Sequence, residues 1–270
     1  LPVFLALLLI LPLSCKKRGN SSIPDTPEKP TLPVAPTPPS KPNPEQKVLT
    51  PKSISTDNFK VDFQYAKDEN NWLTEIRQSD GTREMIGYSD KGIPKEYKRY
   101  LKDDLIYHVY YIVDEEGLVI KAIQYAVASG GKLLTLLGNY QIEYGTQKEI
   151  ERVDWYDFRN MLTASKLYTY NTNLQVTGIR SSGATATVNS FQYDEHSGIF
   201  KHVSQAQLIA IEHQAFYMLN QKSNQKSITI ENQPAKNLMY EMQYNVDGYP
   251  IKITQSDAAN AQRTYNIAYR

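Results

Sequence analysis

Apolar and polar residues alternate in short runs through residues 59–270, and turns rich in Gly, Asp and Asn separate the runs. The clearest case is residues 240–244, a turn at 247–248, and then residues 249–253. Alternation at period two places the apolar side chains of a strand on one face. Gly or Asn in the turn supplies the positive φ that a tight hairpin needs. The pattern therefore predicts an antiparallel β-hairpin.

Similar hairpin units recur along the chain. They occupy residues 63–76, 88–97, 111–123, 140–153, 168–179 and 191–203, and a half unit lies at 265–269. Seven hairpins and a last strand make a mainly β fold, an antiparallel meander of about fifteen strands. Open sheets of more than about 10 strands rarely stay flat. We therefore expect a curved, half-barrel-like sheet.

One segment has helical instead of strand periodicity. Ser204 is followed three residues later by Gln207, the form of a capping box, and Leu208, Ile211 and Leu219 follow at helical spacing. This predicts a helix over about 205–220 whose apolar stripe packs on the concave face of the sheet. A shorter helix is expected at 157–166.

The first residues read as an export signal. Residues 1–13 are apolar apart from two prolines, too short for a transmembrane helix but typical of a signal-peptide core. Ser14 and then Cys15, the single cysteine, follow it. We interpret 1–14 as a lipoprotein signal peptide and Cys15 as the acylated residue that anchors the chain to a membrane. The alternative is an ordinary secretory signal followed by an unmodified cysteine.

The next segment differs in composition from everything after it. Ten of the fifteen prolines lie between Pro24 and Pro51, among Ser, Thr, Lys and Asn. Such a segment buries too little apolar surface to offset its ordering entropy. Residues 15–58 are predicted to be an unstructured tether, and 59–270 the folded domain.

Charge excludes one class of partner. Residues 59–270 carry 23 Lys and Arg against 25 Asp and Glu. Nucleic-acid binding needs a basic face, so no nucleic-acid partner is expected.

The Tyr-x-Tyr-Asp/Asn…Gly…Ile units resemble YD (Rhs-like) repeats. Together with Cys15 and the tether, residues 198–203 and 244–253 resemble uncharacterised cell-envelope lipoproteins of Bacteroidetes. The resemblance implies an exported, lipid-anchored protein of the outer membrane, and it carries no activity with it. Lys16, Lys17 and Arg18 replace the acidic residues of surface-exposed relatives, which favours the periplasmic side.

No arrangement of residues typical of catalysis is present. His108, His196, His202 and His213 lack the spacing of a zinc site, and no P-loop, dinucleotide fingerprint or nucleophile elbow occurs. The histidines are interpreted as surface or locally hydrogen-bonded. We predict a protein that is not an enzyme and has no cofactor or metal site.

The tyrosines leave one question open, because there are twenty of them against seven phenylalanines. They either stabilise the sheet through cross-strand contacts or form an exposed platform for a ligand. The candidates for a platform, clustered in the last strands, are Tyr240, Tyr244, Tyr249, Tyr265 and Tyr269.

Three functions follow as hypotheses. The first is a non-enzymatic binding or scaffolding module whose partner is a glycan, a lipid or an envelope protein. The second is a carrier that encloses an apolar ligand such as lipid, which requires an apolar cavity. The third is an unrecognised hydrolase, which requires carboxylates or histidine converging in a pocket.

Overall fold

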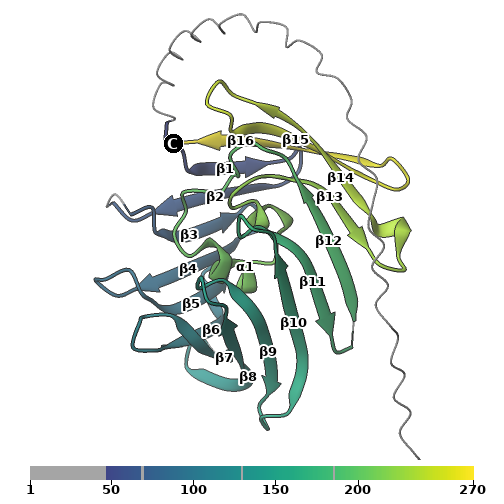
Figure 1. The fold of residues 1–270 in the computed structure, drawn as a ribbon. Helices are drawn as coiled ribbons and strands as arrows, with labels where there is room; N and C mark the ends of the chain where they lie inside the picture. The colour runs from purple at the N-terminus through teal and green to yellow at the C-terminus, as the bar shows by residue number, and fades with distance from the viewer. Residues whose placement is uncertain (1–46, 68–69, 129, 185) are drawn as a thin grey trace, which may run out of the picture. The chain divides into compact units, whose positions relative to one another are not determined.

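The computed structural model describes residues 47–67, 70–128, 130–184 and 186–270. Within these residues, sixteen antiparallel strands follow one another around a closed barrel. Figure 1 shows the strands winding around a central space that contains α1. The predicted signal peptide, Cys15 and most of the predicted tether lie outside the described residues.

The strands are short in the first quarter of the barrel and longer in the middle. They are β1 (Pro51–Ser55), β2 (Lys60–Tyr65), β3 (Leu73–Gln78), β4 (Thr82–Tyr88), β5 (Pro94–Leu101), β6 (Asp104–Val113), β7 (Val119–Ala128), β8 (Leu133–Tyr144), β9 (Ile150–Asp157), β10 (Leu162–Tyr170), β11 (Val176–Ser182), β12 (Thr187–Tyr193), β13 (Gln225–Ile230), β14 (Leu238–Tyr244), β15 (Pro250–Asp257) and β16 (Gln262–Tyr269).

Closure of the sheet corrects the expected half-barrel. Ile54 of β1 pairs with Val61 of β2 on one side and with Ile267 of β16 on the other. The first and last strands therefore leave no unpaired edge, which an open sheet would expose. Six of the seven predicted hairpins are confirmed as local units. The unit at 191–203 is wrong, because β12 ends at Tyr193 and residues 199–203 form no strand. The number of strands and their closure into a ring also differ from the prediction.

The folded domain also begins earlier than predicted. Strand β1 lies inside 15–58, so the tether prediction is wrong over the last residues of that segment. Pro51 suggested a break, yet it occupies the first position of the strand. At that position the missing N–H of proline costs little. Pro94 and Pro250 begin β5 and β15 in the same way.

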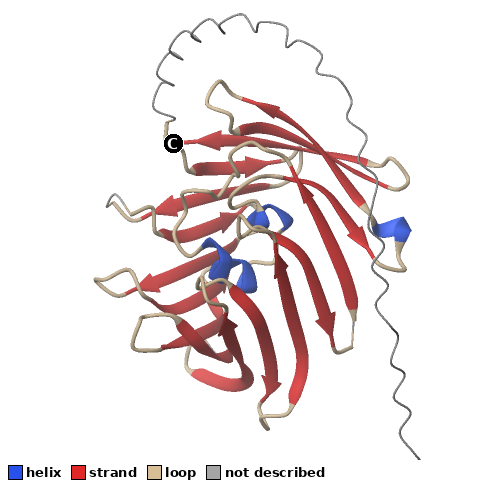
Figure 2. Cartoon of the chain, in the orientation of Figure 1, coloured by secondary structure: helices blue, strands red, loops and turns tan. Residues whose placement is uncertain are grey.

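The lumen is filled by the chain between β12 and β13, residues 194–224, which we call the plug. It contains α1 (Ala206–Glu212) and the 3-10 helix η1 (Phe216–Leu219), and Figure 2 shows both surrounded by strands. Barrels of 16 strands can hold an aqueous channel. Here plug and wall share one apolar core, whose members include Val61, Ile76, Val109 and Val153 of the wall and Phe200, Leu208, Ile209 and Met218 of the plug.

The predicted helix over 205–220 is confirmed in place but not in length. Helical structure ends at Glu212 and resumes as a 3-10 turn at Phe216. The expected capping box is absent, because the Ser204 hydroxyl donates to the Asn70 carbonyl (2.6 Å) and Gln205 begins the helix in the left-handed region (φ 60°). The shorter helix expected at 157–166 is wrong: that stretch is the end of β9, a turn and the start of β10.

Six tyrosines lie at one end of the barrel. Each is the last residue of an even-numbered strand, and its hydroxyl donates to the carbonyl of the first residue of the preceding strand at 2.6–3.0 Å. The pairs are Tyr65–Pro51, Tyr88–Leu73, Tyr144–Val119, Tyr170–Ile150, Tyr193–Val176 and Tyr269–Pro250. We call these residues the tyrosine ring, and the end they occupy the tyrosine end.

Several turns at the tyrosine end have a common construction. Asn245 Oδ1 accepts the backbone N–H groups of Asp247 (3.1 Å) and Tyr249 (2.9 Å), and Gly248 supplies a positive φ. Asp114 and Asn171 are used in the same way. Short polar side chains that bond the backbone two residues later are typical of tight turns.

Within the parts of residues 47–270 that the structure describes, no helix is long and apolar enough to cross a membrane.

Candidate functional site: a cavity at the open mouth

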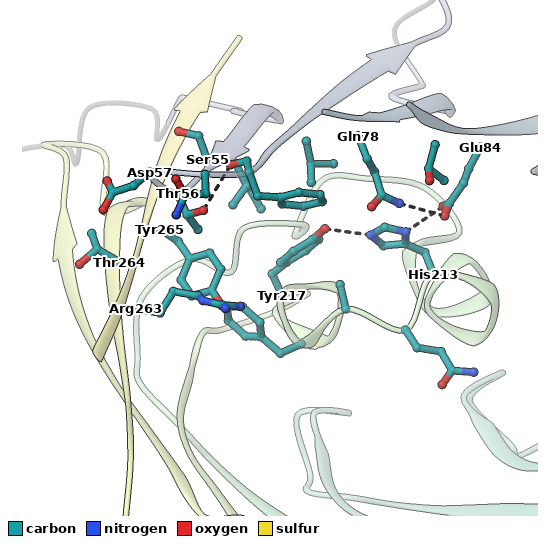
Figure 3. A pocket seen from close by; sticks show the side chains of 18 of the residues that line it. Ser55, Thr56, Asp57, Gln78, Glu84, His213, Tyr217, Arg263, Thr264 and Tyr265 are labelled. Atoms are coloured by element: carbon teal, nitrogen blue, oxygen red, sulfur yellow. Dashed lines mark hydrogen bonds and ion pairs between the residues drawn. The ribbon is translucent and has the colours of Figure 1, made fainter. Parts of the chain in front are cut away.

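A cavity of about 1120 Å³ lies at the end of the barrel opposite the tyrosine ring. Its walls come from the turn between β1 and β2, from the start of β16, and from Gln78, Thr82 and Arg99 of β3, β4 and β5. The floor is the break between α1 and η1, residues 212–217. We call this the mouth cavity, and Figure 3 shows side chains of both walls around it.

A ladder of polar side chains runs across the inner wall beside the cavity. Gln78 Nε2 donates to Glu84 Oε1 (3.3 Å), and Arg99 Nε lies 3.4 Å from the same oxygen. Further round the wall, Gln124 Nε2 donates to the hydroxyl of Tyr107 (2.5 Å). These five residues come from β3 to β7, and we call them the polar ladder. Their partners keep the buried polar atoms of the ladder satisfied.

The plug is fastened to the polar ladder at the end of α1. Arg99 Nη2 donates to the backbone carbonyl of Glu212 (3.0 Å), and the hydroxyl of Tyr107 donates to Glu212 Oε2 (3.1 Å). A guanidinium beside the last carbonyls of a helix satisfies an orphan acceptor and complements the helix dipole. These bonds fix the floor of the cavity relative to its wall.

His213 links plug and wall in a second way. Its Nδ1 lies 2.7 Å from Glu84 Oε2, and its Nε2 lies 2.8 Å from the hydroxyl of Tyr217. Figure 3 shows this chain of Glu84, His213 and Tyr217 along one side of the cavity. Burial raises the pKa of Tyr217, so its hydroxyl stays protonated.

Glu212 is the perturbed acid of the site. Its side chain is buried, and this burial raises its pKa above the ordinary 4.5. The hydrogen bond from Tyr107 and the charge of Arg99 oppose the rise, and Glu84 adds to it. Glu212 therefore retains its proton to higher pH than a carboxyl group in water.

Aromatic rings form the other side of the cavity. Phe216 stacks on Tyr240 at 5.0 Å between centroids and 12° between planes, and it meets Tyr265 edge-on at 5.0 Å. Phe59 lies at the rim and is 36% exposed. The cavity thus has a polar side and an aromatic side.

The five tyrosines predicted as a ligand platform do not form one. Tyr240, Tyr249 and Tyr265 are buried, and Tyr244 and Tyr269 are half-buried at the tyrosine end. Phe216 contacts both Tyr240 and Tyr265, and the rings of Tyr249 and Tyr269 lie 5.4 Å apart, but of the five only Tyr265 lines the mouth cavity. Tyr244 instead stacks on His196 (3.9 Å) and bonds Asp194. The interpretation as an exposed platform is therefore wrong in its geometry.

Sequence reasoning missed the residues that do line the cavity. His213, interpreted as a surface or locally bonded residue, is buried and paired with Glu84, 129 positions away. The available signal was Glu84 and Arg99, which occupy positions where the alternation of β4 and β5 directs side chains inward. A charge on the inner face of a strand needs a partner, and that requirement could have identified them.

The outer wall carries ion pairs and an apolar strip. Lys60 pairs with Asp62 (2.7 Å), and Lys98 pairs with Glu96 (2.7 Å). Exposed apolar side chains cover neighbouring strands β6 to β8: Ile106, Tyr110, Ile112, Ile120, Leu134 and Leu136.

Glu84, His213 and Tyr217 meet at one side of the mouth cavity. Carboxylate, histidine and tyrosine converge, as the hydrolase hypothesis requires, but Tyr217 is a hydroxyl whose pKa is raised, which makes it a poor nucleophile. Among residues 47–270, apart from the four that the structure leaves undescribed, no group of three or more His, Cys, Asp or Glu is placed to hold a metal ion.

The fold is similar to that of known proteins, although the sequence is not. No family model matches the chain, and no curated protein matches it in sequence. The structure is similar to that of a porin-like protein from Bacteroides uniformis, with a TM-score of 0.54 and 10% identity over 84% of this chain and 100% of that one. It is also similar to a porin-like protein from Bacteroides vulgatus, with a TM-score of 0.51 and 10% identity over 82% and 99% of the two chains. At this identity the likeness shows a shared barrel fold and nothing about activity.

Proposed function

We propose that this chain is a non-enzymatic binding protein of a bacterial cell envelope. In this proposal acylated Cys15 tethers it to the outer membrane, facing the periplasm, and the mouth cavity binds a small ligand. The observation that carries the binding role is the cavity itself, whose walls belong to a closed barrel and whose floor is fixed by Arg99 and His213. A preformed concave site with a few converging polar groups is the usual form of a ligand site.

The direction of the chain supports a tethered receptor. Residues 47–50 lead into β1 at the tyrosine end, and the mouth cavity opens at the other end. A membrane anchor upstream of residue 47 would therefore hold the barrel by the end away from its ligand site. Such an arrangement leaves the cavity accessible from the surrounding water.

Two features argue for a protein that does not conduct. The plug fills the lumen with apolar contacts, and charged pairs such as Lys60–Asp62 lie on the outer wall. A barrel in contact with lipid presents an apolar band around its whole circumference. The proposal therefore keeps the barrel in water and assigns membrane attachment to Cys15 alone.

Membrane attachment is tested by labelling cells with radioactive palmitate. We expect label on the wild-type chain and none on Cys15→Ser, which should move from the membrane to the soluble fraction. Protease added to intact cells should leave the barrel undigested until the outer membrane is opened. Equal membrane retention of Cys15→Ser would contradict the anchor, and digestion on intact cells would place the barrel at the cell surface.

The binding role is tested with a variant that fills the cavity. Thr82 lines the mouth cavity, whereas Thr172 is exposed in the turn after β10. We expect small molecules that co-purify with the wild-type chain to be lost from Thr82→Trp and kept by Thr172→Trp, as measured by native mass spectrometry. Equal retention by both variants would contradict binding in this cavity.

A further inference from the structure

We infer that the mouth cavity recognises a neutral, hydroxyl-rich ligand of the oligosaccharide class. The inference rests on the proposed binding function and names the chemistry of its ligand. It follows from three properties of the lining: its charge, its hydrogen-bonding groups and its rings.

The lining carries Arg99 and Arg263 against Asp57, Glu84 and Glu212, and the raised pKa of Glu212 reduces its share of the negative charge, so the two signs nearly balance. On the polar side Arg99 lies between Glu84 and the end of α1. At the rim, Arg263 of β16 and Asp57 of the turn after β1 supply one charge of each sign. An anionic ligand would meet Glu84 and Asp57, and a cationic ligand would meet both arginines. Unbalanced repulsion of this kind costs affinity, so the lining favours a ligand without net charge.

The polar lining suits a ligand that both donates and accepts hydrogen bonds. Asn58, Gln78 and Gln262 contribute side-chain amides, and Thr56 and Thr82 contribute hydroxyls. An amide offers an acceptor and two donors, and a hydroxyl offers both functions. Sugar hydroxyl groups have the same dual capacity, whereas a fatty acid would leave these polar groups unpaired once it excluded water.

Phe59 and Phe216 supply apolar surface on the opposite side. The C–H face of a sugar ring is apolar and packs on an aromatic ring, while its hydroxyls point outward to polar partners. Five of the 21 lining residues are aliphatic or phenylalanine, and two more are tyrosine. Polar side chains interrupt this apolar surface, whereas a lipid chain is best enclosed by a continuous one, so the lining favours the sugar over the apolar ligand.

The test measures binding to the full chain in a mild detergent. The neutral probes are oligomers of glucose, mannose and N-acetylglucosamine, printed as an array and then titrated by calorimetry. Sialic-acid and uronic-acid oligomers and oleic acid are the competing probes. We expect a neutral oligomer to bind, with an affinity that changes by less than about twofold between about 0.05 and about 0.5 M salt, since screening acts on charges.

Variants locate that binding. Phe59→Ala should weaken it about three- to tenfold through the lost ring contact. Phe158→Ala is the matched control, because Phe158 is 59% exposed in the turn after β9 and lies outside the lining. Thr82→Trp should abolish binding. If the neutral oligomer binds Phe59→Ala and Thr82→Trp as tightly as it binds the wild-type chain, the assignment to this site is wrong.

The remaining outcomes separate this inference from the proposed function. Binding of an anionic oligomer or of oleic acid, blocked by Thr82→Trp and without any neutral ligand, would overturn the ligand class and leave the binding function standing. If no probe binds and Thr82→Trp retains the same co-purified molecules as the wild-type chain, both the ligand class and the binding function fall.

Discussion

At the scale of single residues, the excess of tyrosine over phenylalanine has a structural cause. Six even-numbered strands end in a tyrosine whose hydroxyl reaches the carbonyl of the first residue of the preceding strand. Four of these rings, those of Tyr65, Tyr88, Tyr144 and Tyr269, pack against the apolar core. Tyr144 reaches the carbonyl of Val119, which lies beyond the end of the β7–β8 ladder, because the pairing of these strands begins at Lys121 and Gln141. Phenylalanine would fill the same space and leave the carbonyl unsatisfied.

We predict that Tyr144→Phe lowers the free energy of unfolding by about 1 kcal/mol, the usual contribution of one hydrogen bond. The bond lost is that from the hydroxyl to the Val119 carbonyl (3.0 Å). Urea unfolding followed by circular dichroism measures the change. Tyr110→Phe is the control, because that ring is 43% exposed on the outer wall. Equal effects of the two substitutions would contradict a specific role for the tyrosine ring.

Glu212 predicts a pH dependence of stability. Its folded-state pKa is raised, so the folded protein holds this proton more tightly than the unfolded chain. The protonated Glu212 side chain stabilises the folded protein. This stabilisation is fully present below the ordinary pKa of 4.5 and is lost as the pH rises through the folded-state pKa of Glu212. Glu212→Gln removes the titration, and its stability relative to wild type should increase with pH across that window.

Urea midpoints collected from pH 4 upward in steps of about one unit measure this difference. Glu241→Gln, on an exposed position of β14, is the control and should follow the wild-type curve. A constant offset between Glu212→Gln and wild type at every pH would show that Glu212 does not titrate with a raised pKa.

At the scale of elements, the hairpins were predictable because their signals are local. Asn245 and Gly248 lie within four residues of one another and specify their turn without the rest of the chain. The helix was predictable in place and not in length, because its end depends on contacts of His213 and Glu212 with distant strands. The mouth cavity was not predictable for the same reason: its two sides meet only in three dimensions.

The start of α1 gives a prediction of its own. Gln205 has a φ of 60°, a conformation that costs any residue with a Cβ. We expect Gln205→Gly to raise the free energy of unfolding by about 0.5–1 kcal/mol in urea titrations. Gln205→Ala keeps the Cβ and should bring no such gain. A gain from alanine equal to that from glycine would show that the backbone conformation is not the cause.

At the scale of the whole molecule, closure is the feature that local signals could not reveal. Strand β1 pairs with β16 across more than two hundred residues, and β1 lies in a proline-bearing segment that composition assigned to the tether. The alternating pattern describes which side chains share a face and is equally compatible with an open and a closed sheet. The conformation of the plug likewise depends on its packing against the surrounding strands, which no local sequence pattern reveals.

Closure can be tested with a disulfide between the first and last strands. Ser55 pairs with Asn266, and directly paired residues of antiparallel strands lie within disulfide range. In a Cys15→Ser background, Ser55→Cys with Asn266→Cys should oxidise to an intramolecular bond, seen as faster migration in a non-reducing gel. Ser55→Cys with Thr172→Cys is the control and should stay reduced. Failure of the first pair to oxidise would contradict the closed barrel.

The most direct test of the central claim, a ligand bound in the mouth cavity of a plugged barrel, is hydrogen–deuterium exchange of the full chain with and without the tightest-binding oligosaccharide. We predict slower exchange in residues 55–61, 212–217 and 262–265, which line the cavity, and unchanged exchange in the turns of the tyrosine end. Protection confined to those turns or to the outer wall of β6 to β8 would contradict the account.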